Sequence, residues 1–237
     1  MNKHLTIVIP CKNEGKGIID VVKLLLEQTD CKIIIADSSD DEGSVSLLHR
    51  YISIYPNIQI VKGGLPSVAR NNGAKLVTTP YVLFLDADTY IFNPYLLEDC
   101  FITAIKGKYD LVTCKFKTDL SYNWIYRIFD IIQWFTAFTK PFALGGFMLF
   151  KTETFNKLGG FNEEDKVAED YRLSSKIKPR KFKVFNGYIY TPSRRFDKKG
   201  VWYMIKLMWK SWVNKNNDEF FKHDQDYWKW KRKLILN

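Results

Sequence analysis

The sequence has few cysteine and histidine residues, with four and three respectively among 237. The cysteines stand at positions 11, 31, 100 and 114, and they form no C-x-x-C pair and have no close histidine. Zinc sites and disulfide frameworks both require clustered residues of these types. We therefore predict neither kind of site and expect four reduced, structural cysteines.

Long hydrophobic runs are also missing. The apolar run near the N-terminus has only five residues before Pro10 and no small-residue cleavage site, which is too little for a signal peptide. The aromatic stretch at 124–138 contains Arg127, Asp130 and Gln133, which argue against a membrane span. The sequence thus predicts a cytoplasmic protein that starts at Met1 and lies free or at the cytoplasmic face of the membrane.

The third glycine of a dinucleotide-binding loop is missing as well. Gly15 and Gly17 follow the first apolar run, but Asp20 stands where the motif requires glycine. This argues against a nicotinamide-dependent enzyme. No internal repeat, low-complexity segment or flexible linker interrupts the chain.

What the sequence does contain is a series of apolar, β-branched runs separated by helical patterns. With 46% hydrophobic residues, the composition is that of a packed globular protein. Strands without strict alternation, joined by helices of about 10–15 residues, indicate βαβ units. We predict an α/β fold with a Rossmann-like, mostly parallel sheet flanked by helices. The predicted strands are 5–10, 32–37, 58–62, 81–86 and 110–116, and the helices between them are 15–28, 43–55, 66–77 and 94–105.

Polar residues follow each of the first four strands, at 10–15, 37–43, 63–73 and 86–89. Ligands of parallel sheets bind beyond the carboxyl ends of the strands, so these segments are the predicted site. Three of the four carry acids. A bound cation would offset the repulsion between neighbouring carboxylates.

Asp86 and Asp88 are the clearest metal ligands in this set. If the strand end is extended, residues two apart point to the same side, so both carboxylates aim at one point. Hard oxygen donors suit Mg²⁺ or Mn²⁺. The alternative interpretation, a strand followed by an Asp-containing turn, explains the D-x-D spacing equally well.

The order of five segments gives this spacing its context. The sequence resembles the family-2 glycosyltransferases in "IVIPCKNEG" (7–15), "IIIADSSDDEG" (33–43), "SVARNNGAKLVTTPYVLFLDADT" (67–89), "GGFMLFKTETFNKLGGFNE" (145–163) and "AEDYRL" (168–173). The resemblance implies a GT-A fold and inverting transfer of a single sugar from a nucleotide-diphosphate sugar, with a UDP-sugar favoured. It also implies a glycan or lipid-linked acceptor with a hydroxyl or phosphate group.

The same resemblance assigns roles to individual residues. It implies that Asp86 and Asp88 hold the metal and that Asp37 faces the nucleotide base. The nucleotide-binding set it implies is Pro10, Cys11, Asn13, Glu14, Asp37, Arg70, Asp86, Ala87 and Arg195. A surface arginine on a helix is the alternative interpretation of Arg70.

For catalysis, the resemblance implies Asp170 as the base that removes the acceptor proton, with Glu169 in support. Acids at a helix start are also stabilised by the helix dipole alone, which is the plain structural alternative. Gly145, Gly146 and Trp124 are the expected acceptor-binding residues, because backbone without a Cβ lets a sugar approach closely. Tight turns explain the glycines equally well without the family match.

The C-terminal segment differs from the rest of the chain. Residues 194–237 carry 12 Lys and Arg against 5 Asp and Glu, and five of the seven tryptophans. Trp202, Ile205, Trp209 and Trp212 form one stripe of a predicted helix. This stripe either lies in a membrane interface or packs on the catalytic domain. We therefore predict a catalytic domain at 1–193, with halves at 1–110 and 111–193, and a basic helical tail at 194–237.

Three rival functions remain. A sugar-nucleotide nucleotidyltransferase shares the sheet and the acid-bound metal, but the glycine-rich loop expected after its first strand is missing. A nucleic-acid-binding protein would explain the basic, aromatic tail but not the acids, so no nucleic acid is expected as partner. A non-catalytic binding module is disfavoured because the expected acids are all present.

Overall fold

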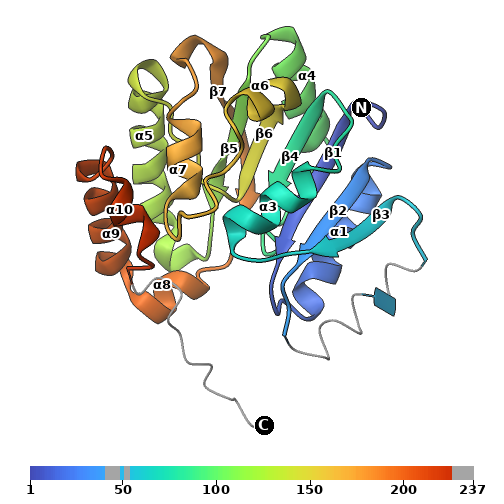
Figure 1. The fold of residues 1–237 in the computed structure, drawn as a ribbon, viewed down its shortest axis with the longest axis horizontal. Helices are drawn as coiled ribbons and strands as arrows, with labels where there is room; N and C mark the ends of the chain where they lie inside the picture. Colours follow the sequence, from blue (N-terminus) through green and yellow to red (C-terminus); the bar gives the residue numbers. More distant parts are fainter. Residues whose placement is uncertain (41–48, 51–53, 226–237) are drawn as a thin grey trace.

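The computed structural model describes residues 1–40, 49–50 and 54–225 (Figure 1). Seven strands form one sheet in the order β3-β2-β1-β4-β6-β5-β7. Their bounds are β1 Leu5–Cys11, β2 Lys32–Asp37, β3 Ile58–Lys62, β4 Tyr81–Leu85, β5 Leu111–Lys117, β6 Phe147–Lys151 and β7 Phe182–Tyr190. The five strands predicted from apolar runs are confirmed within one or two residues at their ends.

The sheet is mostly parallel, as predicted, except for β6. This strand pairs antiparallel with β4 on one side and with β5 on the other. Because it runs in the opposite direction, its first residue, Phe147, pairs with the last residue of β4, Leu85. The loop that precedes β6 therefore reaches the same edge of the sheet as the loop that follows β4.

Helices cover both faces of the sheet (Figure 1). Alternate residues of the central strands separate two cores: Ile7 and Leu83 pack with α1 and α4, whereas Val8 and Phe84 face the opposite side with α6 and α7. The helix bounds are α1 Lys16–Gln28, α3 Pro66–Ala74, α4 Leu96–Lys106, α5 Asn123–Thr139, α6 Thr152–Lys157 and α7 Glu169–Ser174. Most of the helix predicted at 43–55 lies outside the described residues.

Three further helices follow β7: α8 (Arg194–Lys199), α9 (Val201–Val213) and α10 (Asp218–Lys222). Phe196 of α8 and the methionines of α9 pack on Ile125 and Phe129 of α5 in a small third core. The side chain of Phe221 in α10 is fully buried. No helix in the described part of the chain is both long and apolar enough to cross a bilayer.

All four cysteines are free and buried. Cys100 of α4 and Cys114 of β5 lie with their sulfur atoms 3.3 Å apart inside the core. Burial and the neighbouring carboxylates of Asp37 and Glu14 raise the pKa of Cys11 to about 12. A thiol with such a pKa stays protonated at neutral pH, which fits the predicted structural role of the cysteines.

Candidate active site

The predicted site residues converge where β1 and β4 end and β6 begins. The amide of Asp86 lies 3.4 Å from the carbonyl oxygen of Gly146, which joins the loop after β4 to the loop before β6. The helix α7 begins with Glu169 and Asp170 at the same place, because the amide of Gly145 donates to the Asp170 side chain. Segments far apart in the sequence therefore supply one site.

Arg70 of α3 is the centre of this arrangement. Its guanidinium donates to Asp86 Oδ1 at 2.6 Å and to Glu169 Oε1 at 2.7 Å. Only 3% of the residue is exposed. Burial alone would lower the pKa of Arg70, but the charges of Asp86 and Glu169 outweigh it and raise that pKa. The arginine therefore stays charged and connects the predicted metal ligand with the predicted catalytic pair.

Asp170 lies next to this ion pair and has a perturbed titration. Gly145 donates its amide to Asp170 Oδ2 at 2.7 Å, and the amide of Tyr171 donates to Oδ1. Burial, and secondly the negative charge of Glu169, raise the pKa of Asp170 to about 7, against the opposing effect of Arg70. A carboxyl that titrates near neutral pH can accept a proton during a reaction more readily than an ordinary aspartate.

The turn after β4 differs from the extended geometry expected for Asp86 and Asp88. The strand ends at Leu85, and the amide of Thr89 donates to the carbonyl of Asp86 at 3.0 Å, which closes a turn. The expectation of an extended strand end at Asp86 and Asp88 is therefore wrong, while their role as metal ligands stays a prediction. Asp86 points to Arg70 and Asp88 points to Arg194, although both act on the pKa of Glu14.

Arg194, the first residue of α8, was missed by the sequence prediction, which named the adjacent Arg195. Its guanidinium donates to Glu14 Oε2 at 3.0 Å and to Asp88 Oδ2 at 2.6 Å. Burial opposes its charge, but Glu14 and Asp88 raise its pKa. Burial raises the pKa of Glu14, against the lowering effect of Arg194. The adjacent pair in "SRRF" was the only sequence signal for this contact.

The predicted base-binding residues lie at the ends of β1 and β2. Asp37 accepts hydrogen bonds from the amide and the hydroxyl of Ser39, and the amide of Asn13 donates to the same hydroxyl at 2.8 Å. Asn13 takes a left-handed conformation, with φ of 56°. These contacts order the two loops against each other. Pro10 and Cys11 are the last two residues of β1, and Ala87 is buried in the β4 turn.

The predicted acceptor residues fall into two groups. A Cβ on Gly145 would lie 2.8 Å from Arg70 Nη2 and 3.3 Å from Asp170 Oδ2, so this position has no room for a side chain. A Cβ on Gly146 would lie 2.7 Å from the Phe116 ring. Trp124 lies in the first turn of α5, with half of its surface exposed. Its contact with an acceptor stays a prediction, as does the role of Arg195.

The carboxylates fit a divalent cation in donor chemistry. Asp86 and Asp88 each commit one oxygen to an arginine, and among the described residues the other oxygen accepts no hydrogen bond. No cluster of three or more acidic, histidine or cysteine side chains in the described part of the chain is arranged to hold a metal. Two protein carboxylates completed by phosphate oxygens and water are a usual Mg²⁺ site.

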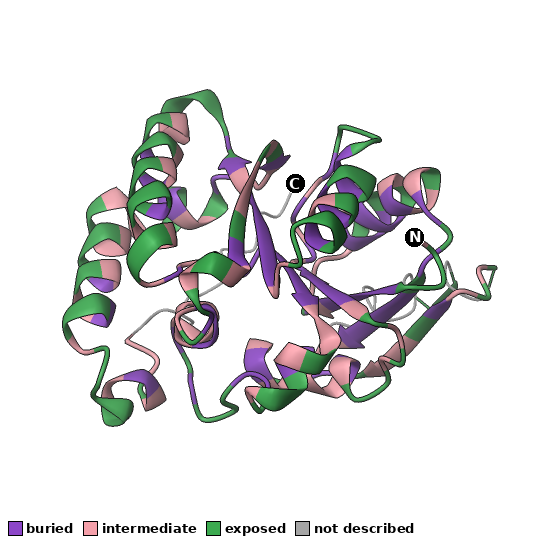
Figure 2. Cartoon of the chain, turned by 90° about the horizontal axis from the view of Figure 1, so that it is seen from above, coloured by how far each residue is buried: buried purple, intermediate pink, exposed green. Residues whose placement is uncertain are grey.

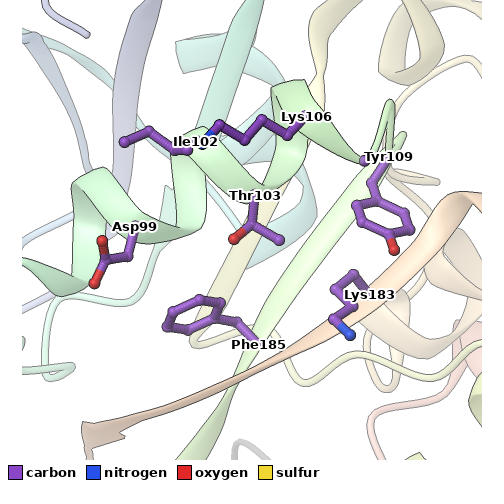
Figure 3. Close-up of a pocket in the computed structure, with 8 residues that line it drawn as sticks. Asp99, Ile102, Thr103, Lys106, Tyr109, Lys183 and Phe185 are labelled. Atoms are coloured by element: carbon purple, nitrogen blue, oxygen red, sulfur yellow. The ribbon is translucent and has the colours of Figure 1, made fainter.

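A hollow of about 560 Å³ lies elsewhere, between α4 and the start of β7 (Figure 3). It is open to solvent and is lined by Thr103, Lys106, Tyr109 and Lys183, among others. None of the predicted site residues borders it. The hollow is therefore separate from the residues predicted to form the site.

Comparison with known proteins gives a family match. The family model described as "Glycosyl transferase family 2" matches residues 6–159. The uncharacterized glycosyltransferase YibD of Escherichia coli is 30% identical over 114 residues, or 46% of this chain and 33% of that protein. The poly(ribitol-phosphate) beta-glucosyltransferase of Bacillus spizizenii is 31% identical over 102 residues, or 40% of this chain and 16% of that protein. The chain thus matches a third or less of these two relatives.

Solved structures share the fold. The mannosyltransferase PcManGT from Pyrobaculum calidifontis, in complex with GDP-Man and Mn²⁺, superposes with a TM-score of 0.67 at 19% identity, covering 79% of this chain and 56% of that one. S. aureus TarS 1–349 in complex with UDP-GlcNAc gives 0.63 at 20% identity, covering 80% and 58%. The predicted GT-A-like sheet is thereby confirmed.

Proposed function

Since this chain belongs to glycosyl transferase family 2, we propose that it is an inverting glycosyltransferase that moves one sugar from a nucleotide-diphosphate sugar to an acceptor. The observation that carries the proposal is the Arg70 network. It joins the acid after β4 to the acids at the start of α7, while Gly145 holds Asp170. Groups with strongly perturbed pKa values gather at functional sites, and the raised pKa of Asp170 beside this network supports the proposal.

In the proposed reaction, Asp170 is the general base. The acceptor hydroxyl oxygen bonds to the anomeric carbon of the donor sugar, and its proton passes to the Asp170 carboxylate. The bond from that carbon to the phosphate oxygen breaks, and its electron pair leaves with the nucleoside diphosphate. Attack and departure on opposite faces invert the anomeric centre. Glu169 supports Asp170 by holding Arg70 in place and by raising the pKa of the base.

The donor would occupy the edge formed by the β1, β2 and β4 loops. Asp37 is suited to accept an N–H from the base, and Arg194 and Arg195 lie on α8, where positive charge suits a diphosphate. Asp86 and Asp88 would hold Mg²⁺ or Mn²⁺, which when bound neutralises charge on the departing diphosphate. A UDP-sugar is the favoured donor, and a glycan or lipid-linked hydroxyl or phosphate is the proposed acceptor.

The test separates binding from chemistry with two variants. We expect Asp88→Ala to abolish transfer and to weaken metal-dependent nucleotide binding in calorimetry. Asp170→Asn should lower kcat by a factor of about 10³ or more, as expected when a general base is lost, while leaving nucleotide binding within about twofold of the parent. Undiminished turnover in Asp170→Asn would show that another group accepts the proton.

A further inference from the structure

The outer faces of α5 and α9 carry many exposed large apolar side chains. On α9, Trp202, Trp209 and Trp212 are 82%, 63% and 59% exposed. On α5, Phe135 and Phe138 are 61% and 68% exposed. Scattered apolar side chains are ordinary on a surface, whereas a contiguous group of this kind marks an interaction site.

These side chains follow helical spacing and therefore form faces. The exposed apolar residues of α9 are Trp202, Ile205, Trp209, Trp212 and Val213, and those of α5 are Trp124, Ile128, Ile131, Ile132, Trp134, Phe135 and Phe138. The opposite side of α9, with Met204 and Met208, packs on Ile125 and Phe129 of α5. Each helix is thus apolar on both its buried and its exposed side. The tryptophans of α9 are not the core residues that one interpretation of the sequence required.

The two helices lie together at one end of the molecule (Figures 1 and 2). Their outward surfaces are largely exposed in the view of Figure 2. The helix α8 starts with the site residue Arg194, and a single residue, Gly200, separates its end from the start of α9. The exposed face is therefore one short helix away from the candidate active site.

The segment that contains α9 is strongly basic. Residues 198–217 contain five lysines and no acid: Lys198, Lys199, Lys206, Lys210 and Lys215. Lys206 is exposed on α9, and the Lys215 ammonium lies 5.5 Å from the centre of the Trp212 ring. Tryptophan rings sit well at the boundary between headgroups and acyl chains, and basic side chains beside them bind anionic headgroups.

From this combination we propose that the α5–α9 face, defined as the exposed apolar residues above with the five lysines, binds the surface of a bilayer containing anionic lipids. A second copy of the chain fits less well, because a two-fold contact through this face would bring together two segments in which lysines outnumber acids. The proposal does not depend on the transfer reaction. Its test needs no sugar donor.

Vesicle flotation of the full chain tests the proposal directly. The probes are vesicles of phosphatidylcholine alone and vesicles that also contain phosphatidylglycerol. We expect binding to the anionic vesicles that weakens with added salt, and much weaker binding to the neutral ones. Lys206→Glu/Lys210→Glu should reduce the affinity for anionic vesicles by about tenfold or more, since each basic side chain near such a surface contributes about 1 kcal/mol.

Trp202→Ala/Trp209→Ala should reduce binding to a similar extent, and because both rings are exposed it should leave the melting temperature unchanged. Matched controls are Lys3→Glu/Lys32→Glu, exposed lysines near the β2 end of the sheet, and Tyr95→Ala, which is 69% exposed on another surface. Neither control should alter flotation. Failure of the parent protein to float with anionic vesicles would overturn the proposal. So would a dimer that both tryptophan substitutions dissociate, because the face would then be an interface between copies.

Discussion

At the scale of single residues, Asp170 links the geometry of the site to a measurable pH dependence. Its pKa is raised to about 7, so the carboxyl is largely protonated in acid and becomes a competent base as the pH rises. We expect kcat/KM to rise about tenfold per pH unit well below pH 7 and to level off above it. The measurement is a pH–rate profile with the donor and metal concentrations held fixed.

Glu169→Gln provides the control for this assignment. Burial remains, but the second cause of the raised pKa, the negative charge of Glu169, is removed. The substitution also leaves Arg70 freer to stabilise the Asp170 carboxylate. Both effects lower the pKa of Asp170, so the acid limb should move to lower pH. An acid limb that stayed in place, or moved to higher pH, would mean that a different group governs the profile.

Gly145 gives a second prediction at this scale. An alanine there would place its Cβ 2.8 Å from Arg70 Nη2, closer than real Cβ contacts come, so the Arg70 network must shift. We expect Gly145→Ala to destabilise the fold by about 1–3 kcal/mol and to lower kcat at least tenfold. Thermal unfolding and product formation measure the two effects.

Gly17→Ala is the matched control, because its Cβ would meet the Tyr90 hydroxyl at 3.7 Å and Glu14 Oε2 at 4.0 Å, which are ordinary contacts. Gly17 lies in the first turn of α1, where alanine favours the helix more than glycine does. The control should be as stable as the parent or more so. Equal behaviour of the two variants would remove the argument that position 145 must lack a side chain.

The sequence predicted which residues form the site better than it predicted which of them contact one another. Acids after strands and the order of the five motifs indicated Asp86, Glu169 and Asp170, and the structure brings all three to one site through Arg70. The partners of each acid were not predictable, because the turn at Asp86 depends on a hydrogen bond from Thr89 rather than on strand geometry. Arg194 and Arg195 are chemically identical, and only the orientation of α8 decides which one meets Glu14.

At the scale of elements, Arg194 holds α8 to the site, because its guanidinium forms an ion pair with the carboxylate of Asp88. A divalent ion binding Asp88 must share this carboxylate with the guanidinium or displace it. We expect Arg194→Ala to tighten Mn²⁺ binding in the absence of nucleotide by up to about fivefold, since such partly exposed pairs contribute up to about 1 kcal/mol. Titration followed by electron paramagnetic resonance of free Mn²⁺ measures this.

The control is Lys106→Ala, which removes an exposed positive charge from α4 by the open hollow. It should leave Mn²⁺ affinity unchanged. Weaker Mn²⁺ binding in Arg194→Ala than in the parent would show that the arginine organises the ion site rather than competing for it.

At the level of elements, the direction of β6 is a feature that the sequence pattern could not predict. Its apolar run identifies a strand, but pairing between β4 and β5 depends on how α5 returns the chain across the sheet, which no local pattern contains. The antiparallel direction is what places Gly146 beside Asp86. The orientation of α9 was equally undetermined by its sequence, because both of its faces are apolar and only packing decides which one is buried.

At the scale of the whole molecule, the sheet positions loops that carry acidic side chains whose charges act on one another. The negative charges of Asp88 and Asp86 act on Glu14, and Arg70 and Arg194 offset the charge of these carboxylates. A ligand that supplies further positive charge and donors should therefore stabilise the folded state as a whole. Like any ligand that binds only the native protein, it raises the melting temperature by an amount that grows with the logarithm of its concentration divided by its dissociation constant.

We expect a UDP-sugar together with Mn²⁺ to raise the melting temperature by several degrees at about 100 times its dissociation constant, which corresponds to about 2.7 kcal/mol. Either component alone should give less than the pair, because the metal and the diphosphate complete each other's binding sites. The shifts in melting temperature that GDP- and TDP-sugars give in the same panel show which nucleotide base the site prefers. Asp88→Ala should lose the Mn²⁺-dependent part of the shift in melting temperature. Without ligand, its melting temperature should equal that of the parent, because the Asp88 carboxylate is partly exposed and its ion pair among the described residues is with Arg194. If no nucleotide sugar shifted the transition with or without Mn²⁺, the acids would have to serve a purpose other than holding a donor.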